Sequence, residues 1–284
     1  MAGVMAAALA ASLLFAPVGA GLVRQWYEDP ASSHGLVLLI AAGWLVRQRW
    51  TALRDLPMRP STLGLVALAF SLLLHVAGAL AGELFILRIS SVASLAAAVA
   101  ALSGLAHLRA LATPVALLFL AIPLPATVVT SLTLPLQLTA SHMAAGLLNA
   151  GGIAAARDGN ILTLSAVTLE VAEACSGLRS IVSLASLIAV AKAVGVVPTR
   201  HALLLAAATV PIAIAGNSLR VTLTGVLAHV VGPWTARGVV HDATGYAAFA
   251  GMCLALALIH RLVLARRRAG APPSGACDSP ALAW

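Results

Sequence analysis

Residues 171–197 read VAEACSGLRSIVSLASLIAVAKAVGVV, and this stretch joins a cluster of reactive side chains to a long apolar run. The cluster holds a carboxylate (Glu173), a thiol (Cys175), a glycine (Gly177) and a guanidinium (Arg179). The run that follows has about the twenty residues that a helix needs to cross a bilayer. A cysteine in the first turn of such a helix lies at the positive end of the helix dipole, which favours the thiolate. The stretch therefore predicts a membrane-spanning helix that begins at a reactive thiol.

The composition of the whole chain indicates a membrane protein. Hydrophobic residues make up 61% and charged residues 9% of the sequence, and the mean hydropathy is +1.01. A soluble domain is about half apolar and about a quarter charged. The net charge of +8 would suggest nucleic acid for a soluble protein, but in a membrane protein it reflects arginines in cytoplasmic loops. We therefore expect no nucleic-acid partner and no large soluble domain, and the three cysteines do not form a disulfide framework.

Apolar windows separated by charged or turn residues predict an all-α polytopic membrane protein with about eight transmembrane helices. The predicted spans lie near residues 4–23, 34–46, 62–81, 84–106, 111–129, 177–197, 202–222 and 242–264. The first span could be a signal peptide, but no basic segment precedes it, which favours an uncleaved helix. We expect one transmembrane domain over residues 1–268 and a disordered cytoplasmic tail over residues 269–284, which is rich in Pro, Gly, Ser and Ala.

The distribution of basic residues predicts the orientation in a cytoplasmic membrane. With both termini in the cytoplasm, 11 of the 17 Lys and Arg residues lie inside and 6 lie outside, as the positive-inside rule requires. Of the acidic residues, only Asp55 and Asp278 then lie inside. Polar groups that could act on a substrate therefore gather at the extracytoplasmic face.

The longest region between predicted spans, roughly residues 130–174, has two halves of different period. The first half contains Pro135 among leucines and predicts a kinked or interfacial helix. In the second half, leucine and valine alternate with polar residues from Leu162 onward, and Asp158-Gly159 supplies a turn. This pattern predicts a small extracytoplasmic β-hairpin before the sixth span.

Three predicted helices bring different reactive groups to the same membrane face. Cys175 precedes the sixth span, Arg220 ends the seventh, and His241 begins the eighth. A thiolate can attack a carbonyl carbon and form an acyl-enzyme. An imidazole can take the thiol proton and return it to the leaving amine, and a guanidinium can stabilise the oxyanion. The three residues therefore predict a cysteine peptidase or transpeptidase.

Nearby residues could support this site. Asn217 shares a helix face with Arg220 and could orient it. Gly177 would keep the backbone near the thiol open to a substrate strand. Gly245 follows His241 by one helical turn and would leave space beneath the imidazole.

Each of these residues also has a purely structural interpretation. Cys175 could be a small core residue, and Arg220 could extend to the membrane interface. His241 and Asp242 could form a polar helix start, and Arg179 could bind lipid headgroups or a neighbouring carboxylate. No spacing is typical of a metal site, and we predict neither a metal nor a cofactor.

The motifs around these residues resemble those of the exosortase/archaeosortase family of membrane transpeptidases. Residues 173–180, EACSGLRS, are similar to the cysteine signature of that family. NSLR (217–220) and HDATGY (241–246) are similar to its arginine and histidine signatures and follow in the same order. WYED (26–29), followed by Ser33-His34-Gly35, resembles its first outer loop, although Ser32 stands where the family usually has tyrosine.

The resemblance implies an activity and roles for the residues. Cys175 would be the nucleophile, His241 the acid/base, and Arg220 the group that stabilises the oxyanion or positions the substrate. The residues that would bind substrate or support the site are Glu173, Ser176, Gly177, Arg179, Asn217 and His34. The substrates would be membrane-anchored proteins with a carboxy-terminal sorting signal, often Pro-Glu-Pro, a hydrophobic span and a basic cluster. Water or an acceptor amine would receive the acyl group, often in species that make exopolysaccharide.

A non-catalytic protein, either a transporter or an assembly factor for exopolysaccharide export, is the alternative. Transporters place ionisable residues near the bilayer midplane, on broken helices. In this sequence these residues gather at the predicted outer ends of the spans, which favours a reaction at the surface.

Overall fold

The computed structural model describes residues 2–165, 167–171 and 177–269, which are mostly helical. The helices are α1 Ala2–Glu28, α2 His34–Gln48, α3 Trp50–Asp55, α4 Thr62–Ala81, α5 Leu84–Leu102, α6 Leu105–Ala110, α7 Ala112–Leu120, α8 Ala126–Ala150, α9 Leu178–Ala193, α10 Thr199–Val230, the short 3-10 helix η2 Pro233–Ala236 and α11 Gly238–Ala269. The strands are β1 Ala155–Asp158, β2 Ile161–Leu164 and β3 Thr168–Glu170. The tail predicted over residues 269–284 lies outside the described residues, apart from Ala269.

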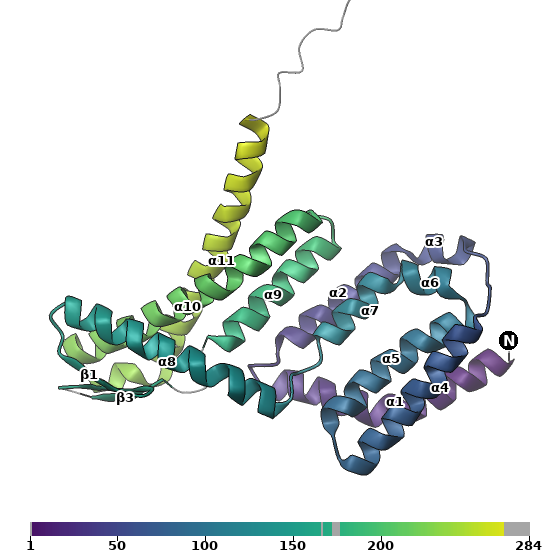
Figure 1. Ribbon diagram of the computed structural model, residues 1–284, viewed down its shortest axis with the longest axis horizontal. Helices are drawn as coiled ribbons and strands as arrows, with labels where there is room; N and C mark the ends of the chain where they lie inside the picture. The colour runs from purple at the N-terminus through teal and green to yellow at the C-terminus, as the bar shows by residue number, and fades with distance from the viewer. Residues whose placement is uncertain (1, 166, 172–176, 270–284) are drawn as a thin grey trace, which may run out of the picture.

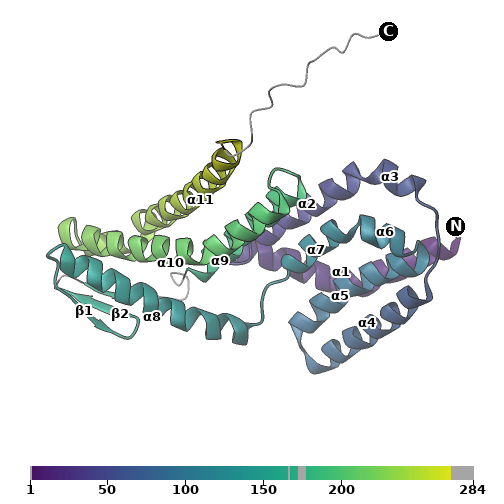
Figure 2. The same ribbon diagram turned by 45° about the horizontal axis from the view of Figure 1, so that its top comes forward.

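The second half of the chain is assembled on α10. This helix contacts α8, α9, α11 and η2, and Figures 1 and 2 show it running between α9 and the sheet. In the first half, α4 packs mainly on α5, and α2 packs on α7. Because α2 also contacts α9, the two halves meet along these helices.

Four described helices are long and apolar enough to cross a bilayer, so the chain is a multi-pass membrane protein. They are Thr62–Ala81, Leu84–Leu102, Thr199–Val230 and Gly238–Ala265. These helices match the third, fourth, seventh and eighth predicted spans, and the prediction of eight spans is not confirmed. The second and sixth predicted spans form shorter helices, α2 with 15 residues and α9 with 16 residues.

The fifth predicted span, residues 111–129, is not one continuous helix. α7 ends at Leu120 and α8 begins at Ala126, with Pro123 and Pro125 between them. Proline lacks the N–H that a helix requires and disfavours the helical conformation of the residue before it. The hydropathy window missed this break because all the residues around the prolines are apolar. α8 then continues through Pro135, where a kinked helix was predicted.

The α4–α5 pair is closely packed because glycines let the two backbones meet. A Cβ on Gly64 would lie 2.4 Å from the backbone nitrogen of Ala101. A Cβ on Gly78 would lie 2.8 Å from the side chain of Ile86. Small residues of this kind drive helix association in lipid, where no hydrophobic effect favours it. Gly82, with φ 69°, ends α4 in the left-handed conformation and turns the chain into α5.

Polar side chains buried between α4 and α5 hydrogen-bond one another. The Ser94 hydroxyl donates to Ser71 Oγ at 2.9 Å. The Ser90 hydroxyl donates to a main-chain carbonyl oxygen at 2.9 Å, so it accepts the 3.0 Å hydrogen bond from His75 Nδ1. His75 Nδ1 is thus satisfied within the helix pair.

The loop before α2 is fixed by the buried Trp26. Its indole Nε1 donates to the carbonyl oxygen of Ala121 at 2.9 Å. A Cβ on Gly35 would lie 2.2 Å from the same nitrogen, so only glycine fits there. Ser32, at the position where the family usually has tyrosine, is buried and donates to Asp29 Oδ2 at 2.7 Å. The serine therefore closes this loop on itself.

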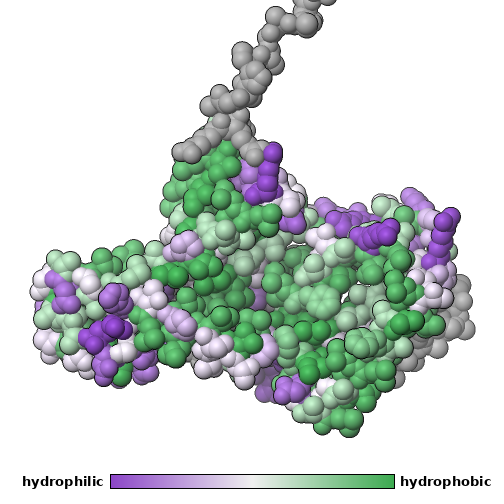
Figure 3. Space-filling view, viewed as in Figure 1, coloured by the Kyte–Doolittle hydropathy of each residue, from purple (hydrophilic) through white to green (hydrophobic). Residues whose placement is uncertain are grey.

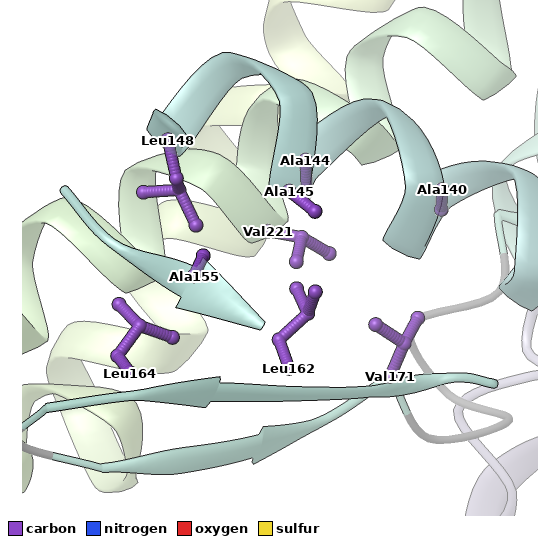
Figure 4. Close-up of a cluster of buried hydrophobic side chains, with 9 residues drawn as sticks. All are labelled: Ala140, Ala144, Ala145, Leu148, Ala155, Leu162, Leu164, Val171 and Val221. Atoms are coloured by element: carbon purple, nitrogen blue, oxygen red, sulfur yellow. The ribbon is translucent and has the colours of Figure 1, made fainter. Parts of the chain in front are cut away.

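The three strands form an antiparallel sheet in the order β1-β2-β3. The predicted hairpin turn at Asp158-Gly159 joins β1 to β2, with Gly159 at φ 59°, and β3 pairs with β2 as a third strand. Leu162 and Leu164 face α8 and Val221 of α10 in one buried cluster (Figure 4). The side-chain amide of Asn149 bonds both backbone groups of Ala155 at 3.0 Å. The sheet is thus attached to both α8 and α10.

Hydrophobic and hydrophilic surface residues lie over different elements. In Figure 3, hydrophobic residues cover most of the visible face of α11 and of the α4–α5 pair. Hydrophilic residues gather near the sheet and, on the opposite side of the view, near α3 and α6. This distribution fits helices that lie in lipid and polar groups that lie at their ends.

Candidate active site between α10, α11 and the sheet

Arg220 of α10 and His241 of α11 are joined by a hydrogen bond. Arg220 Nη2 lies 3.0 Å from His241 Nε2. A guanidinium has no acceptor, so Nε2 must accept this bond and the ring proton must be on Nδ1. The proximity predicted from the order of the helices is therefore observed, although the two residues are 21 positions apart.

The turn between α10 and α11 makes this contact possible. Gly232, with φ 133°, and Gly238, with φ 63°, flank η2 in conformations that favour glycine. The chain thus reverses within a few residues, and His241 begins the return close to Arg220. Arg220 lies about 32 Å along α10 from Thr199 at 1.5 Å per residue, which is about the thickness of the hydrocarbon core.

Gly245 makes room for the guanidinium. A Cβ at this position would lie 3.0 Å from Arg220 Nη2 and 3.1 Å from its Cζ. The sequence predicted that Gly245 would leave space beneath the imidazole of His241. In the structure the side chain beside Gly245 is that of Arg220, so this glycine serves the cation.

A cavity of about 640 Å³ lies against the Arg220–His241 pair. Its walls come from β2, β3, α10, η2 and the start of α11. Its lining residues are Ile161, Val167, Thr168, Leu169, Glu170, Val171, Arg220, Val221, Thr224, Pro233, Trp234, Ala236, Arg237 and His241. Arg220 Nε is buried without a hydrogen-bond partner among the described residues.

A second cavity, of about 490 Å³, lies between α10 and α11. It is lined mainly by small and apolar residues, including Gly216, Ala247 and Gly251. Arg220 lines this cavity as well as the first. The guanidinium therefore lies where a mostly apolar cavity between two helices meets a cavity beside the sheet that has both polar and apolar lining residues.

The start of α9 is held beside the helix that carries Arg220. Gly177 is buried, has φ 84° and precedes the first residue of α9, Leu178. A Cβ on Gly177 would lie 3.4 Å from the Cβ of Asn217. Asn217 is itself buried and precedes Arg220 by three positions. The cysteine motif thus reaches α10 less than one helical turn from Arg220.

Three predicted site residues, Glu173, Cys175 and Ser176, lie outside the described residues. The helix was expected to carry Cys175 in its first turn, whereas the described α9 begins three residues later, at Leu178. Arg179 is exposed in the first turn of α9 and lines neither cavity. His34, at the start of α2, is half-buried and likewise lines neither cavity.

Two residues that no sequence motif indicated, Trp234 of η2 and Arg237 directly after it, also belong to the site. Trp234 is 63% exposed although it is aromatic, and Arg237 is also exposed. Both line the larger cavity, as the residues of β3 do. The available signal was the aromatic and basic pair in a short, otherwise apolar connection between two spans, next to the histidine motif.

Fold and site together define a multi-pass helical membrane protein with a cavity of mixed polar and apolar lining where two helices and a small sheet meet. The sequence model of the transmembrane exosortase family matches residues 26–258. The chain therefore belongs to the exosortase family, as its three motifs indicated. No curated protein and no solved structure matches it.

Proposed function

We propose that the protein is a membrane-embedded cysteine peptidase or transpeptidase that cleaves carboxy-terminal sorting signals of membrane-anchored proteins. The observation that carries this proposal is the Arg220–His241 hydrogen bond of 3.0 Å at the wall of a 640 Å³ cavity. Cation and imidazole come from different helices, and the motif that contains Cys175 packs beside the same part of α10. Such a convergence serves acyl transfer better than it serves packing.

In the proposed reaction each of the three groups has a separate role. The Cys175 thiolate attacks the scissile carbonyl carbon, and the guanidinium of Arg220 donates to the oxyanion that forms. His241, protonated by the thiol, returns this proton to the leaving amine as the C–N bond breaks. An acceptor amine or water then attacks the thioester and releases the thiol.

The observed hydrogen bond implies an order of events. While His241 Nε2 accepts from Arg220 and Nδ1 carries the ring proton, the imidazole has no free lone pair for the thiol proton. A substrate carbonyl offers the guanidinium another acceptor. We infer that substrate draws Arg220 away from His241, which frees Nε2 to act as the base only when substrate is bound.

We place this site at the extracytoplasmic face of the cytoplasmic membrane. The arginine distribution supports this orientation, and the position of Arg220 about one hydrocarbon thickness along α10 supports an interfacial depth. Glu173, Ser176, Gly177, Arg179, Asn217 and His34 are assigned supporting or substrate-binding roles. Of these, Gly177 and Asn217 have the strongest support because they lie beside the helix segment that carries Arg220.

Co-expression with a reporter tests the proposal. The reporter carries a short carboxy-terminal motif, an apolar span and a basic cluster, and its processing is followed by a shift on a gel. The intact protein should process the reporter, and Cys175→Ala should abolish processing while inserting normally. Cys253→Ala is the matched control, because Cys253 packs against an apolar cluster of α9–α11 and should leave processing intact. Full processing by Cys175→Ala would exclude the proposal and favour the non-catalytic alternative.

A further inference from the structure

The strand β3 has a free edge, and that edge faces the larger cavity. β3 is the last strand of the sheet and pairs only with β2 among the described residues. Leu164 N donates to Val167 O, and Val171 N donates to Asn160 O, both at 2.9 Å. In an antiparallel pair, hydrogen-bonded and non-hydrogen-bonded positions alternate. The intermediate residues Thr168 and Glu170 therefore direct their N–H and C=O groups away from β2.

The cavity follows this edge along its whole length. All five residues from Val167 to Val171 line it, as do both members of the Arg220–His241 pair. A volume of about 640 Å³ lies within the range of about 300–1,000 Å³ that is typical of ligand sites. Four extended residues span about 13 Å. A short peptide strand can therefore lie along β3 and still reach the paired residues.

The other lining residues suit a peptide better than a lipid tail. Trp234 offers an exposed aromatic face, and Arg237 offers a guanidinium that no described carboxylate approaches within 4.0 Å. The edge itself offers two N–H and two C=O groups. An acyl chain could use none of these polar groups, whereas an extended peptide satisfies them by strand addition. An acidic side chain on that peptide would complement Arg237.

We propose that the segment of the substrate around the scissile bond binds as a fourth strand on the free edge of β3, with its side chains against Trp234 and Arg237. This inference rests on the proposed peptidase function and names how that site holds its substrate. The position along the chain supports it. β3 ends at Glu170, five residues before Cys175 in the sequence, so the bound strand would pair with a part of the chain that is close in sequence to the proposed nucleophile. Backbone pairing fixes the carbonyl, and the side-chain wall selects the sequence.

Backbone-edited substrates test the pairing. In each of a series of synthetic substrates one amide N–H of a non-proline residue around the scissile bond is replaced by an ester oxygen, and KM is measured with the full-length protein in lipid nanodiscs. Strand addition predicts that KM rises about fivefold to tenfold where the lost N–H pairs with β3. These positions are every second one along the substrate, and KM should stay unchanged at the positions between them. Equal effects at neighbouring positions, or no effect at any position, would overturn the strand.

Variants of β3 give the complementary test. Thr168→Pro and Glu170→Pro each remove one N–H that faces the cavity, and proline is tolerated on an edge strand. Their KM should exceed that of Thr168→Ala and Glu170→Ala, which keep the N–H, by about fivefold or more. Equal KM values for the proline and alanine variants would contradict the proposal.

Alkylation of the Cys175 thiol shows that each variant is folded. Alkylation should proceed in all four variants at the rate measured for the protein without substitutions, since none of these substitutions removes a proposed reacting group. Failure of the unmodified protein to process any substrate would overturn the peptidase function. Processing without positional alternation would overturn the strand alone.

Discussion

The α4–α5 and α10–α11 pairs use glycine for opposite purposes. Both pairs consist of helices apolar enough to span a membrane. In α4–α5, a Cβ on Gly64 would collide with backbone, so the glycine closes the interface. In α10–α11, Gly245 lies beside Arg220, and a Cβ on Gly216 would lie 2.6 Å from Met252 Cγ. These glycines admit side chains, and a cavity remains between the helices.

The polar groups of the two pairs differ in the same way. Serines and a histidine between α4 and α5 bond one another. Between α10 and α11, Arg220 bonds His241 but retains a buried Nε without a partner among the described residues. α11 is also the least covered of the four candidate spans, with 11% of its apolar window buried. The candidate site therefore lies at the helix pair whose packing is incomplete.

The largest expected effect is at Arg220. Arg220→Gln should lower kcat about 10²- to 10³-fold, as loss of an oxyanion donor does. Arg220→Lys should recover only part of this loss, because an ammonium lacks the planar set of donors. Single-turnover assays with purified protein measure both variants. Full activity of Arg220→Gln would show that the polar groups of α10–α11 are as structural as those of α4–α5.

The next effect should be on stability and should appear at Gly64. The Cβ of Gly64→Ala would meet the backbone of α5 at 2.4–2.8 Å, and overpacking of this kind costs about 1–3 kcal/mol. Thermal unfolding in detergent should shift to lower temperature, while activity per folded molecule is retained. Gly43→Ala is the matched control, since a Cβ at Gly43 meets nothing within 4 Å. Equal melting temperatures for the two variants would refute the close contact between α4 and α5.

Gly245→Ala should show the reverse pattern. Its Cβ would press on the guanidinium at 3.0 Å, and the end of a flexible side chain can move at little cost in folding. Displacement of Arg220 from its working position should lower kcat/KM about tenfold, since a misplaced catalytic group costs up to about 10²-fold. Melting should remain near that of Gly43→Ala. A large fall in stability with unchanged activity would mean that Gly245, like Gly64, serves packing.

The parts of this fold that sequence predicts well are those with a clear periodicity. The alternation from Leu162 to Glu170 gave β2 and β3. β1, by contrast, reads Ala-Ala-Arg-Asp and has no apolar alternation, so only its pairing reveals it. Hydropathy likewise located α10 and α11, but it could not detect the break at Pro123, where every neighbour is apolar.

The candidate site divides in the same way. Arg220 and His241 could be related because they flank one turn between two long helices, which brings them to one level whatever happens earlier in the chain. Trp234 and Arg237 were missed because a short connection has no period from which burial can be inferred. The role of Gly245 depends on the rotamer of Arg220, which no spacing determines.

The smallest expected effect tests whether the polar groups of α4–α5 are purely structural. Ser94→Ala removes the 2.9 Å hydrogen bond to Ser71, while the Ser71 hydroxyl keeps its bond to the carbonyl oxygen of Leu68 at 3.0 Å. Because the remaining hydroxyl stays satisfied, unfolding should become easier by only about 0.6 kcal/mol, as is usual for such bonds in membranes. Reporter processing should be unchanged. A loss of processing at normal stability would mean that the α4–α5 hydroxyls take part in function, and the contrast between the two helix pairs would fail.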